Sequence, residues 1–122
     1  MKTAIIGTRT FENYTQLCEI IDNLEHKPTE IISGGAMGAD ALAERYAKEN
    51  DLPLIVFKAN WEKHGKAAGP FRNQTIVENC EQLVAFWDGQ SKGTNHSIKT
   101  ARAKGKLTKV VNYGATQQTS LF

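Results

Sequence analysis

Apolar runs of strand length alternate along this chain with amphipathic stretches of helix length, and this alternation constrains the fold most. The apolar runs lie at residues 2–8, 30–33, 54–57, 83–87 and 109–112. Between them, apolar side chains recur at helical spacing in residues 14–24, 40–50, 71–80 and 94–104. Strands and helices in this order are typical of βαβ units. We therefore predict an α/β fold with a five-stranded parallel sheet. The order 3-2-1-4-5 is predicted because it places the loops after the first and fourth strands beside the crevice of a doubly wound sheet.

Two segments of the chain carry expectations of their own. The third apolar run, Leu54 to Phe57, holds no polar side chain, which predicts a strand covered on both faces. The segment 58–69 holds two glycines and three lysines together with Trp61 and His64, and we predict a long loop there. Long loops in compact domains usually have a function.

The chain has the size of one domain. Its 122 residues divide into a predicted domain at 1–113 and a polar, flexible tail at 114–122. No apolar run approaches the roughly 20 residues that cross a bilayer, so we expect a cytoplasmic protein without a membrane partner. Cys18 and Cys80 lie in separate helical segments, where we expect free thiols. No metal-ligand spacing occurs around His64 or His96, and we predict neither a metal nor a cofactor.

Charge is distributed unevenly along the sequence. Residues 89–122 hold 6 of the 15 Lys and Arg and none of the 13 Asp and Glu. This basic segment fits a solvated helix face. It also fits a surface that attracts an anionic ligand or a nucleic acid.

Glycines gather where the predicted strands end. Eight of the ten follow one of the first four strands and precede a helix: Gly7, Gly34, Gly35, Gly38, Gly65, Gly69, Gly89 and Gly93. In an open parallel sheet these segments meet at the carboxyl edge, where ligands bind near the reversal of strand order. The sequence therefore predicts a ligand site at this edge.

Two of these segments have the features of phosphate-binding loops. Residues 33–40 join a strand to a helix and run from Ser33 to Asp40. Residues 88–94 run from Asp88 to Thr94 and interleave the hydroxyls of Ser91 and Thr94 with Gly89 and Gly93. Backbone N–H groups in such a loop, and the helix N-terminus behind it, attract phosphate, although a tight turn without a ligand is the alternative. Asp40 fits either a helix cap or an acceptor for a ribose hydroxyl. Two such loops at one edge favour a nucleotide.

Two arginines are candidates for neutralising the phosphate. Arg9 follows the first strand, and Arg72 lies at a predicted helix start, where the dipole disfavours a cation unless a phosphate or carboxylate compensates. Surface ion pairs are the alternative. Trp61 and His64 are candidates for covering a base, whereas Trp87, which ends a strand, fits the core.

Four linked motifs resemble one known family. They are Gly7-Thr8-Arg9, the segment 33–40, the segment 59–73 with Trp61, Gly65, Gly69, Arg72 and Asn73, and the segment 86–94 with Asp88, Gly89, Ser91, Gly93 and Thr94. In this order they resemble the YspA-like, YpsA-related branch of the SLOG superfamily over residues 3–112. The resemblance implies a Rossmann-like three-layer domain with a pocket for a nucleotide or a nucleotide-derived signal.

The resemblance also carries an enzyme alternative. Relatives resembling the cytokinin-activating phosphoribohydrolases cleave the N-glycosidic bond of nucleoside monophosphates with an arginine near a helix start and a glutamate shortly after Gly-Thr. Arg72 matches the arginine, but Ser97 stands where the carboxylate belongs. An oxocarbenium-like transition state needs a nearby anion, which Asp88 or Asp40 would have to supply. Binding without turnover is therefore the leading hypothesis, with Arg72 and Asp88 as the catalytic residues of the alternative.

Two further resemblances concern partners. Gly7-Thr8-Arg9, the segment 33–40 and the segment 72–76 also resemble the DNA-processing protein A family, which binds single-stranded DNA, but aromatic platforms for bases are scarce here. The final five residues resemble the bacterial sliding-clamp-binding pentapeptide, with contacts expected from Gln118, Ser120, Leu121 and Phe122. Thr119 replaces the usual leucine, and docking of the tail on the domain or a second subunit is the alternative.

The predicted site draws on all four motifs. Its ligand-binding residues are Gly7, Thr8, Arg9, Ser33, Gly34, Gly35, Gly38, Asp40, Trp61, His64, Gly69, Arg72, Asn73, Asp88, Gly89, Ser91, Gly93 and Thr94. The glycine loops cradle the phosphate of a nucleotide-derived small molecule, the arginines neutralise it, and the long segment covers the base. We also expect a homo-oligomer, because apolar faces are left on an edge helix.

Overall fold

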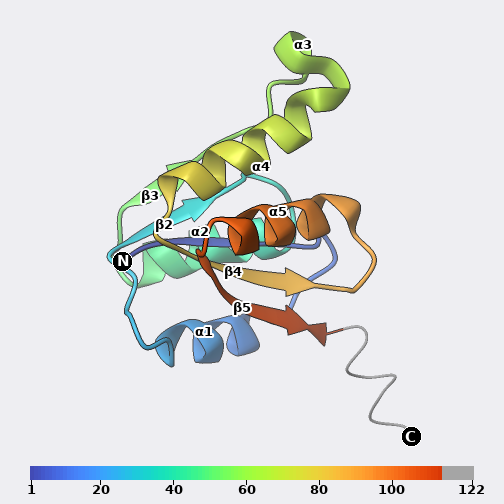
Figure 1. The fold of residues 1–122 in the computed structure, drawn as a ribbon. Helices are drawn as coiled ribbons and strands as arrows, with labels where there is room; N and C mark the ends of the chain where they lie inside the picture. The colour runs from blue at the N-terminus through green and yellow to red at the C-terminus, as the bar shows by residue number, and fades with distance from the viewer. Residues whose placement is uncertain (114–122) are drawn as a thin grey trace, which may run out of the picture.

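The computed structural model describes residues 1–113. The tail at 114–122 lies outside the described residues, and so do the residues expected to bind a sliding clamp: Gln118, Ser120, Leu121 and Phe122. Five strands form one parallel sheet in the order β3-β2-β1-β4-β5 (Figure 1). They are β1 (Lys2–Gly7), β2 (Glu30–Ser33), β3 (Leu54–Val56), β4 (Gln82–Trp87) and β5 (Leu107–Asn112). The predicted α/β fold and strand order are confirmed.

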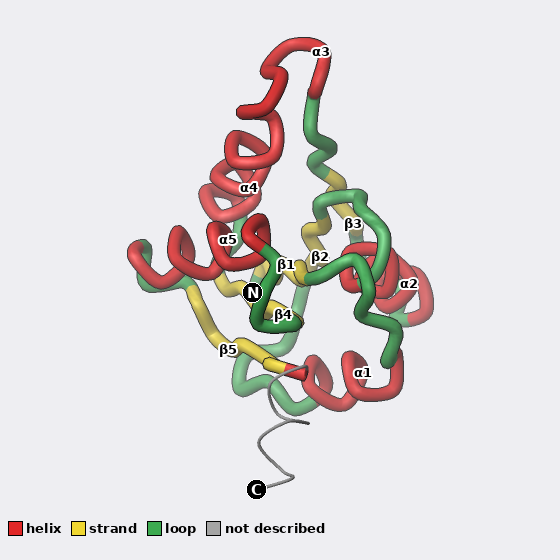
Figure 2. Tube along the Cα trace, turned by 90° about the vertical axis from the view of Figure 1, so that its right-hand side faces the viewer, coloured by secondary structure: helices red, strands yellow, loops and turns green. Residues whose placement is uncertain are grey.

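Helices cover both faces of the sheet, which gives three layers. They are α1 (Tyr14–Asp22), α2 (Ala39–Glu49), α3 (Trp61–His64), the short 3₁₀ helix η1 (Gly65–Ala67), α4 (Ala68–Asn79) and α5 (Lys92–Ala103). In Figure 2, α1 and α2 lie on one side of the strands, and α4 and α5 lie on the other. Within residues 1–113, no helix combines the length and the apolar character needed to cross a bilayer.

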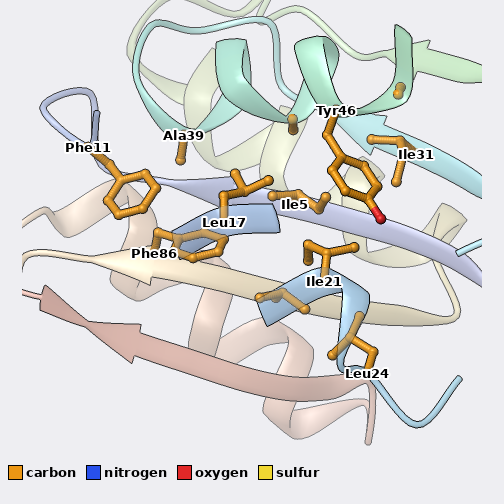
Figure 3. Packing of buried hydrophobic residues seen from close by; sticks show 12 residues of the cluster. Ile5, Phe11, Leu17, Ile21, Leu24, Ile31, Ala39, Tyr46 and Phe86 are labelled. Carbon is orange, nitrogen blue, oxygen red and sulfur yellow. The ribbon is translucent and has the colours of Figure 1, made fainter. Parts of the chain in front are cut away.

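Alternation along the central strands explains these layers, because successive side chains of a strand point to opposite faces. Ile5 of β1 packs with Leu17 and Ile21 of α1 and with α2 (Figure 3). Its neighbours Ala4 and Ile6 pack on the other face, in the cluster that contains side chains of α4 and α5. Full burial of an isoleucine or leucine contributes about 2 kcal/mol to folding. The two core clusters therefore stabilise the packing of the helices on the sheet, and the loops at the carboxyl ends of the strands are available to form a site.

The segment 58–69 differs from the predicted long loop. It contains α3, η1 and the first residues of α4, which begins at Ala68. The side chain of Asn60 caps α3, because its Oδ1 accepts a hydrogen bond of 3.0 Å from the N–H of Lys63. Figures 1 and 2 show α3 extending beyond the sheet as an arm. The prediction of an irregular loop was wrong because this cap organises a short helix.

β3 also differs from its prediction. It is an edge strand that pairs with β2, and Leu54 and Ile55 are 39% and 38% exposed. An apolar run resembles a fully covered strand in composition, but its position in the sheet decides how much of it is covered. The prediction that helices cover this strand on both faces was therefore wrong.

The cysteines and Trp87 occupy the core or its margin. Cys18 and Cys80 are free thiols, as predicted; Cys80 is buried and Cys18 is half-buried. Burial raises the pKa of the Cys80 thiol. Trp87 packs against the cluster on the α4 and α5 face, and its Nε1 donates a hydrogen bond of 3.0 Å to the carbonyl oxygen of Ser91. Trp87 thus links the end of β4 to the start of α5.

Candidate functional site

A cavity of about 560 Å³ opens at the carboxyl edge of the sheet. Its wall is built from the residues after β1, the β2–α2 loop, α3 and the first turns of α4 and α5. Side chains with functional chemistry in this wall are Thr8, Arg9, Asp40, Trp61, Arg72 and Lys92. The site thus lies where β2 and β4 flank β1, at the carboxyl ends of the strands, as ligand sites in open α/β sheets do.

The N-terminus of α5 forms one side of the cavity. Ser91 is the N-cap residue, and its Oγ accepts a hydrogen bond of 3.4 Å from the N–H of Thr94. Lys92 and Gly93 open the helix, where backbone N–H groups have no partner within the helix. A Cβ added to Gly93 would meet no atom within 4 Å, so the backbone there faces open space. These N–H groups and the helix dipole favour an anion at this position.

Asp88 holds the turn that precedes α5. Its Oδ1 accepts hydrogen bonds of 2.8 Å from the N–H groups of Gln90 and Ser91, and these bonds lower the pKa of the Asp88 carboxyl. The N–H of Asp88 donates to Oγ1 of Thr8 at 3.2 Å. Asp88 and Gly89 do not line the cavity. The Asp88 carboxylate therefore positions the start of α5 from behind the cavity wall.

Arg72 and Asn73 connect three walls of the cavity. Nη1 of Arg72 donates a hydrogen bond of 2.6 Å to the carbonyl oxygen of Gly34, and its Nε donates one of 2.9 Å to Oδ1 of Asn73. Nδ2 of Asn73 donates in turn to the carbonyl oxygen of Gly93 at 3.2 Å. α4 begins three residues earlier than predicted, so Arg72 lies beyond its first turn. Its partners are a backbone carbonyl and an amide.

Asp40 is a buried carboxyl in the cavity wall, with an exposed fraction of 4%. Its Oδ2 accepts a hydrogen bond of 3.2 Å from the N–H of Ala36. Burial raises the pKa of Asp40 to about 6, although the Ala36 N–H and the Arg72 guanidinium oppose the shift. The N-cap residue of α2 is Gly38, and Asp40 makes no capping hydrogen bond. Asp40 therefore stabilises the β2–α2 loop instead of capping the helix.

Most glycines of the predicted phosphate loop serve contacts within the protein. A Cβ on Gly34 would lie 2.7 Å from both Nη1 of Arg72 and Oδ2 of Asp40. One on Gly38, where φ is +73°, would overlap the carbonyl oxygens of Thr8 and Arg9. Ser33, Gly34, Gly35 and Gly38 do not line the cavity, whereas Gly7, Gly69 and Gly93 do. Close packing of loops accounts for the glycines behind the wall.

The two aromatic candidates occupy different places. Trp61 lines the large cavity and is 58% exposed. The His64 ring stacks on Phe71 with centroids 4.4 Å apart and lines a separate cavity of about 150 Å³. Arg72 lines both cavities. The structure thus brings Trp61, and not His64, into the large cavity.

Sequence reasoning missed several residues of the wall. Ala36, Pro70, Ile76, Lys92, His96 and Ser97 line the cavity beside the predicted residues. Lys92 and His96 are four residues apart at the start of α5, and this helical spacing is a signal that could have found both. Among residues 1–113 there is no group of three His, Cys, Asp or Glu side chains placed to hold a metal ion.

Comparison with known proteins identifies a family for this chain. The family model of the YspA, cpYpsA-related SLOG family matches residues 1–64, which include β1 and the β2–α2 loop. The gene 61 protein of Mycobacterium phage D29 is 32% identical over 122 residues, which cover 93% of this chain and 96% of that protein. No solved structure gives a significant match. The chain belongs to the YspA, cpYpsA-related SLOG family.

Proposed function

We propose that the large cavity binds a nucleotide or a nucleotide-derived signal and that the protein senses or sequesters it. The observation that carries this proposal is the convergence of a helix N-terminus and three cationic side chains, Arg9, Arg72 and Lys92, on one cavity. Its volume of about 560 Å³ is typical of small-molecule sites. Membership of a SLOG family supports a nucleotide-related ligand.

The phosphate of the ligand binds at the start of α5. Backbone N–H groups of Lys92 and Gly93 donate to phosphate oxygens there, as in other sites at helix N-termini. Arg9 and Lys92 form no ion pair with any acidic residue of the part described, 1–113, so both can neutralise the phosphate. Arg72, held by Gly34, contributes its charge from the α4 side.

The base binds toward the arm. Trp61 presents an exposed indole ring to the cavity, and Ile6 and Ile76 supply apolar surface. An aromatic ring that stacks on a base contributes about 1–3 kcal/mol of binding free energy. Such stacking tolerates different bases, so the phosphate contacts and the sugar contacts must provide most of the selectivity.

Calorimetric titration with a panel of nucleoside monophosphates, diphosphates and cyclic nucleotides tests this proposal. Lys92→Ala should weaken binding about tenfold, because a charge-assisted hydrogen bond is lost. Lys104→Ala is the matched control: it removes an exposed lysine at the other end of α5, outside the cavity wall, and should leave affinity unchanged. Native mass spectrometry of the purified protein should detect a retained nucleotide-like mass. No heat with any nucleotide and no retained molecule would contradict the proposal.

Hydrolysis of an N-glycosidic bond is a second candidate function, which the placement of Asp40 favours. Asp40 brings a carboxyl into the cavity wall, whereas Asp88 lies behind it. A carboxylate there can stabilise positive charge at the anomeric carbon while water adds to that carbon and the base leaves with a proton. Chromatography should then detect free base, which Asp40→Asn abolishes and Asp88→Asn retains. No base released from any nucleoside monophosphate would rule this function out.

A further inference from the structure

Asp40 holds an unused hydrogen-bond acceptor. Its Oδ1 is buried and has no hydrogen-bond partner within residues 1–113. The backbone N–H of Gly7 stabilises the charged form of the carboxyl, but no hydrogen bond of normal geometry reaches Oδ1. An unsatisfied buried carboxylate oxygen costs several kcal/mol of folding free energy at most sites. Asp40 itself lines the large cavity, so a small turn of its carboxyl brings this oxygen within reach of a donor group of a ligand.

The orientation of this acceptor is fixed by its surroundings. Oδ2 is held by the N–H of Ala36, and the carboxylate lies against the bare Cα of Gly34, with the Arg72 guanidinium near the same point. Glu44, on the same helix, is engaged by the Ser33 hydroxyl at 3.4 Å and does not line the cavity. The carboxyl is therefore confined to a narrow range of orientations, which limits the entropic cost of binding a ligand.

The chemistry of the group restricts what it receives. An ionised carboxylate accepts hydrogen bonds and cannot donate. The pKa of Asp40 is about 6, so the carboxyl is mostly ionised at pH 7.5. The complementary ligand group is an O–H or N–H donor that is not itself negatively charged. A sugar hydroxyl meets this requirement, and a phosphate oxygen does not.

The position of Asp40 relative to α5 indicates which part of a bound nucleotide can donate a hydrogen bond to Asp40. Asp40 follows β2 and α5 follows β4, and these two strands flank β1, so the carboxyl ends of the two strands lie two strand spacings apart, about 10 Å. That is the length scale of a phosphate and the sugar attached to it. With the phosphate at the start of α5 and the base at Trp61, the sugar is the part of the nucleotide left to face Asp40.

We propose that Asp40 accepts a hydrogen bond from a ribose hydroxyl, so that the cavity selects ribonucleotides over deoxyribonucleotides. This inference rests on the proposed nucleotide site and names the class of nucleotide that the site takes. Asp40 is its specificity-determining residue.

The first test compares ribonucleotides with deoxyribonucleotides on the unmodified protein. The four common nucleoside 5′-monophosphates and their 2′-deoxy and 3′-deoxy counterparts are titrated at pH 7.5. Removal of the correct hydroxyl should weaken binding at least about tenfold, the loss expected for a hydrogen bond to a charged group. Equal affinities would overturn this inference and leave the nucleotide site standing. Binding of none of them would overturn both.

Asp40→Asn provides the second test. The asparagine carbonyl must face the N–H of Ala36 to keep the loop contact, so its NH₂ group replaces the free acceptor with a donor. Selectivity for the ribonucleotide should fall at least about tenfold while the affinity for the deoxyribonucleotide changes little. Glu44→Gln, which removes a carboxylate one helical turn away and outside the wall, should keep the selectivity. Undiminished selectivity in folded Asp40→Asn protein would overturn the inference.

Discussion

The guanidinium of Arg72 donates a hydrogen bond of 2.6 Å from Nη1 to the backbone carbonyl oxygen of Gly34. This bond joins α4 to the β2–α2 loop across the carboxyl edge of the sheet. Asn73, the next residue, joins α4 to α5 through the carbonyl oxygen of Gly93. Two consecutive residues of one helix therefore hold three walls of the large cavity at fixed separations.

Arg72→Ala should reduce the free energy of unfolding by about 2 kcal/mol, because the variant loses two hydrogen bonds of a charged group. Arg72→Lys keeps the charge but cannot reach both acceptors, and it should recover only part of the loss. Urea unfolding measures both. Arg45→Ala is the control, since it removes an exposed arginine that pairs with Glu49 and lies over the Tyr14 ring, and its loss should be smaller. Equal losses for Arg72→Ala and Arg45→Ala would show that the Gly34 contact contributes little.

Gly38→Ala should be strongly destabilising, by about 3 kcal/mol or more. Gly38 has a φ of +73°, and an added Cβ would overlap the carbonyl oxygens of Thr8 and Arg9. Gly105→Ala isolates the conformational part of this effect, because φ there is +69° and the added Cβ would meet nothing within 4 Å. It should cost about 1 kcal/mol. Thermal unfolding of the two variants compares them, and similar melting temperatures would contradict the close approach of the two loops.

The titration of Asp40 should make the free energy of unfolding decrease as the pH rises from 4 to 7. Its pKa is about 6 in the folded protein against 3.8 for the free side chain, so folding favours the protonated form. The stabilisation that comes from the protonated Asp40 carboxyl is fully present below about pH 4 and is lost as the pH rises through 6. The loss amounts to about 3 kcal/mol.

Asp40→Asn removes this titration and provides the comparison. Urea unfolding at half-unit steps between pH 4 and 7 should show the Asn variant gaining about 3 kcal/mol relative to the unmodified protein. Carboxylates elsewhere titrate equally in both proteins and cancel in the difference. A difference that stays constant across this pH range would mean that the carboxyl is not desolvated by burial.

Asp88→Ala should loosen the start of α5 and cost about 1 kcal/mol, as for the loss of a capping side chain. Its Oδ1 accepts two backbone N–H groups, which hold the pKa of the carboxyl below its usual range. Its contribution is therefore present at neutral pH and is lost as the pH falls through the lowered pKa. Hydrogen exchange of the Gln90 and Ser91 amides should accelerate in Asp88→Ala. Unchanged exchange would show that the turn holds without the carboxylate.

The periodicity of the chain was sufficient to predict a parallel sheet with helices on both faces, and the strand order followed from the doubly wound arrangement that the glycine-bearing edge indicated. Ile5 points to one face, Ala4 and Ile6 to the other, and such alternation in the central strands requires helices on both sides. Periodicity does not distinguish an edge strand from a central one, which is why the exposure of Leu54 and Ile55 was missed. It also cannot reveal a helix as short as α3, for which the Asn60 cap is the main local signal.

The site could be predicted only in part. Glycine positions placed it at the carboxyl edge, and Arg9, Trp61 and Arg72 line the cavity there. The sequence could not show that the Asp88 carboxylate turns back to its own loop or that His64 stacks on Phe71. Such details depend on side-chain direction and long-range packing, which residue spacing does not specify.

The three-residue length of β3 limits how far this sheet can grow. A strand so short offers few unpaired backbone groups to a strand of another molecule. The exposed side chains of Leu54 and Ile55 make this edge apolar, but its short backbone offers few hydrogen bonds to a strand of a second molecule. The short length of β3 thus disfavours edge-to-edge pairing of sheets between molecules, although its apolar side chains are exposed to solvent.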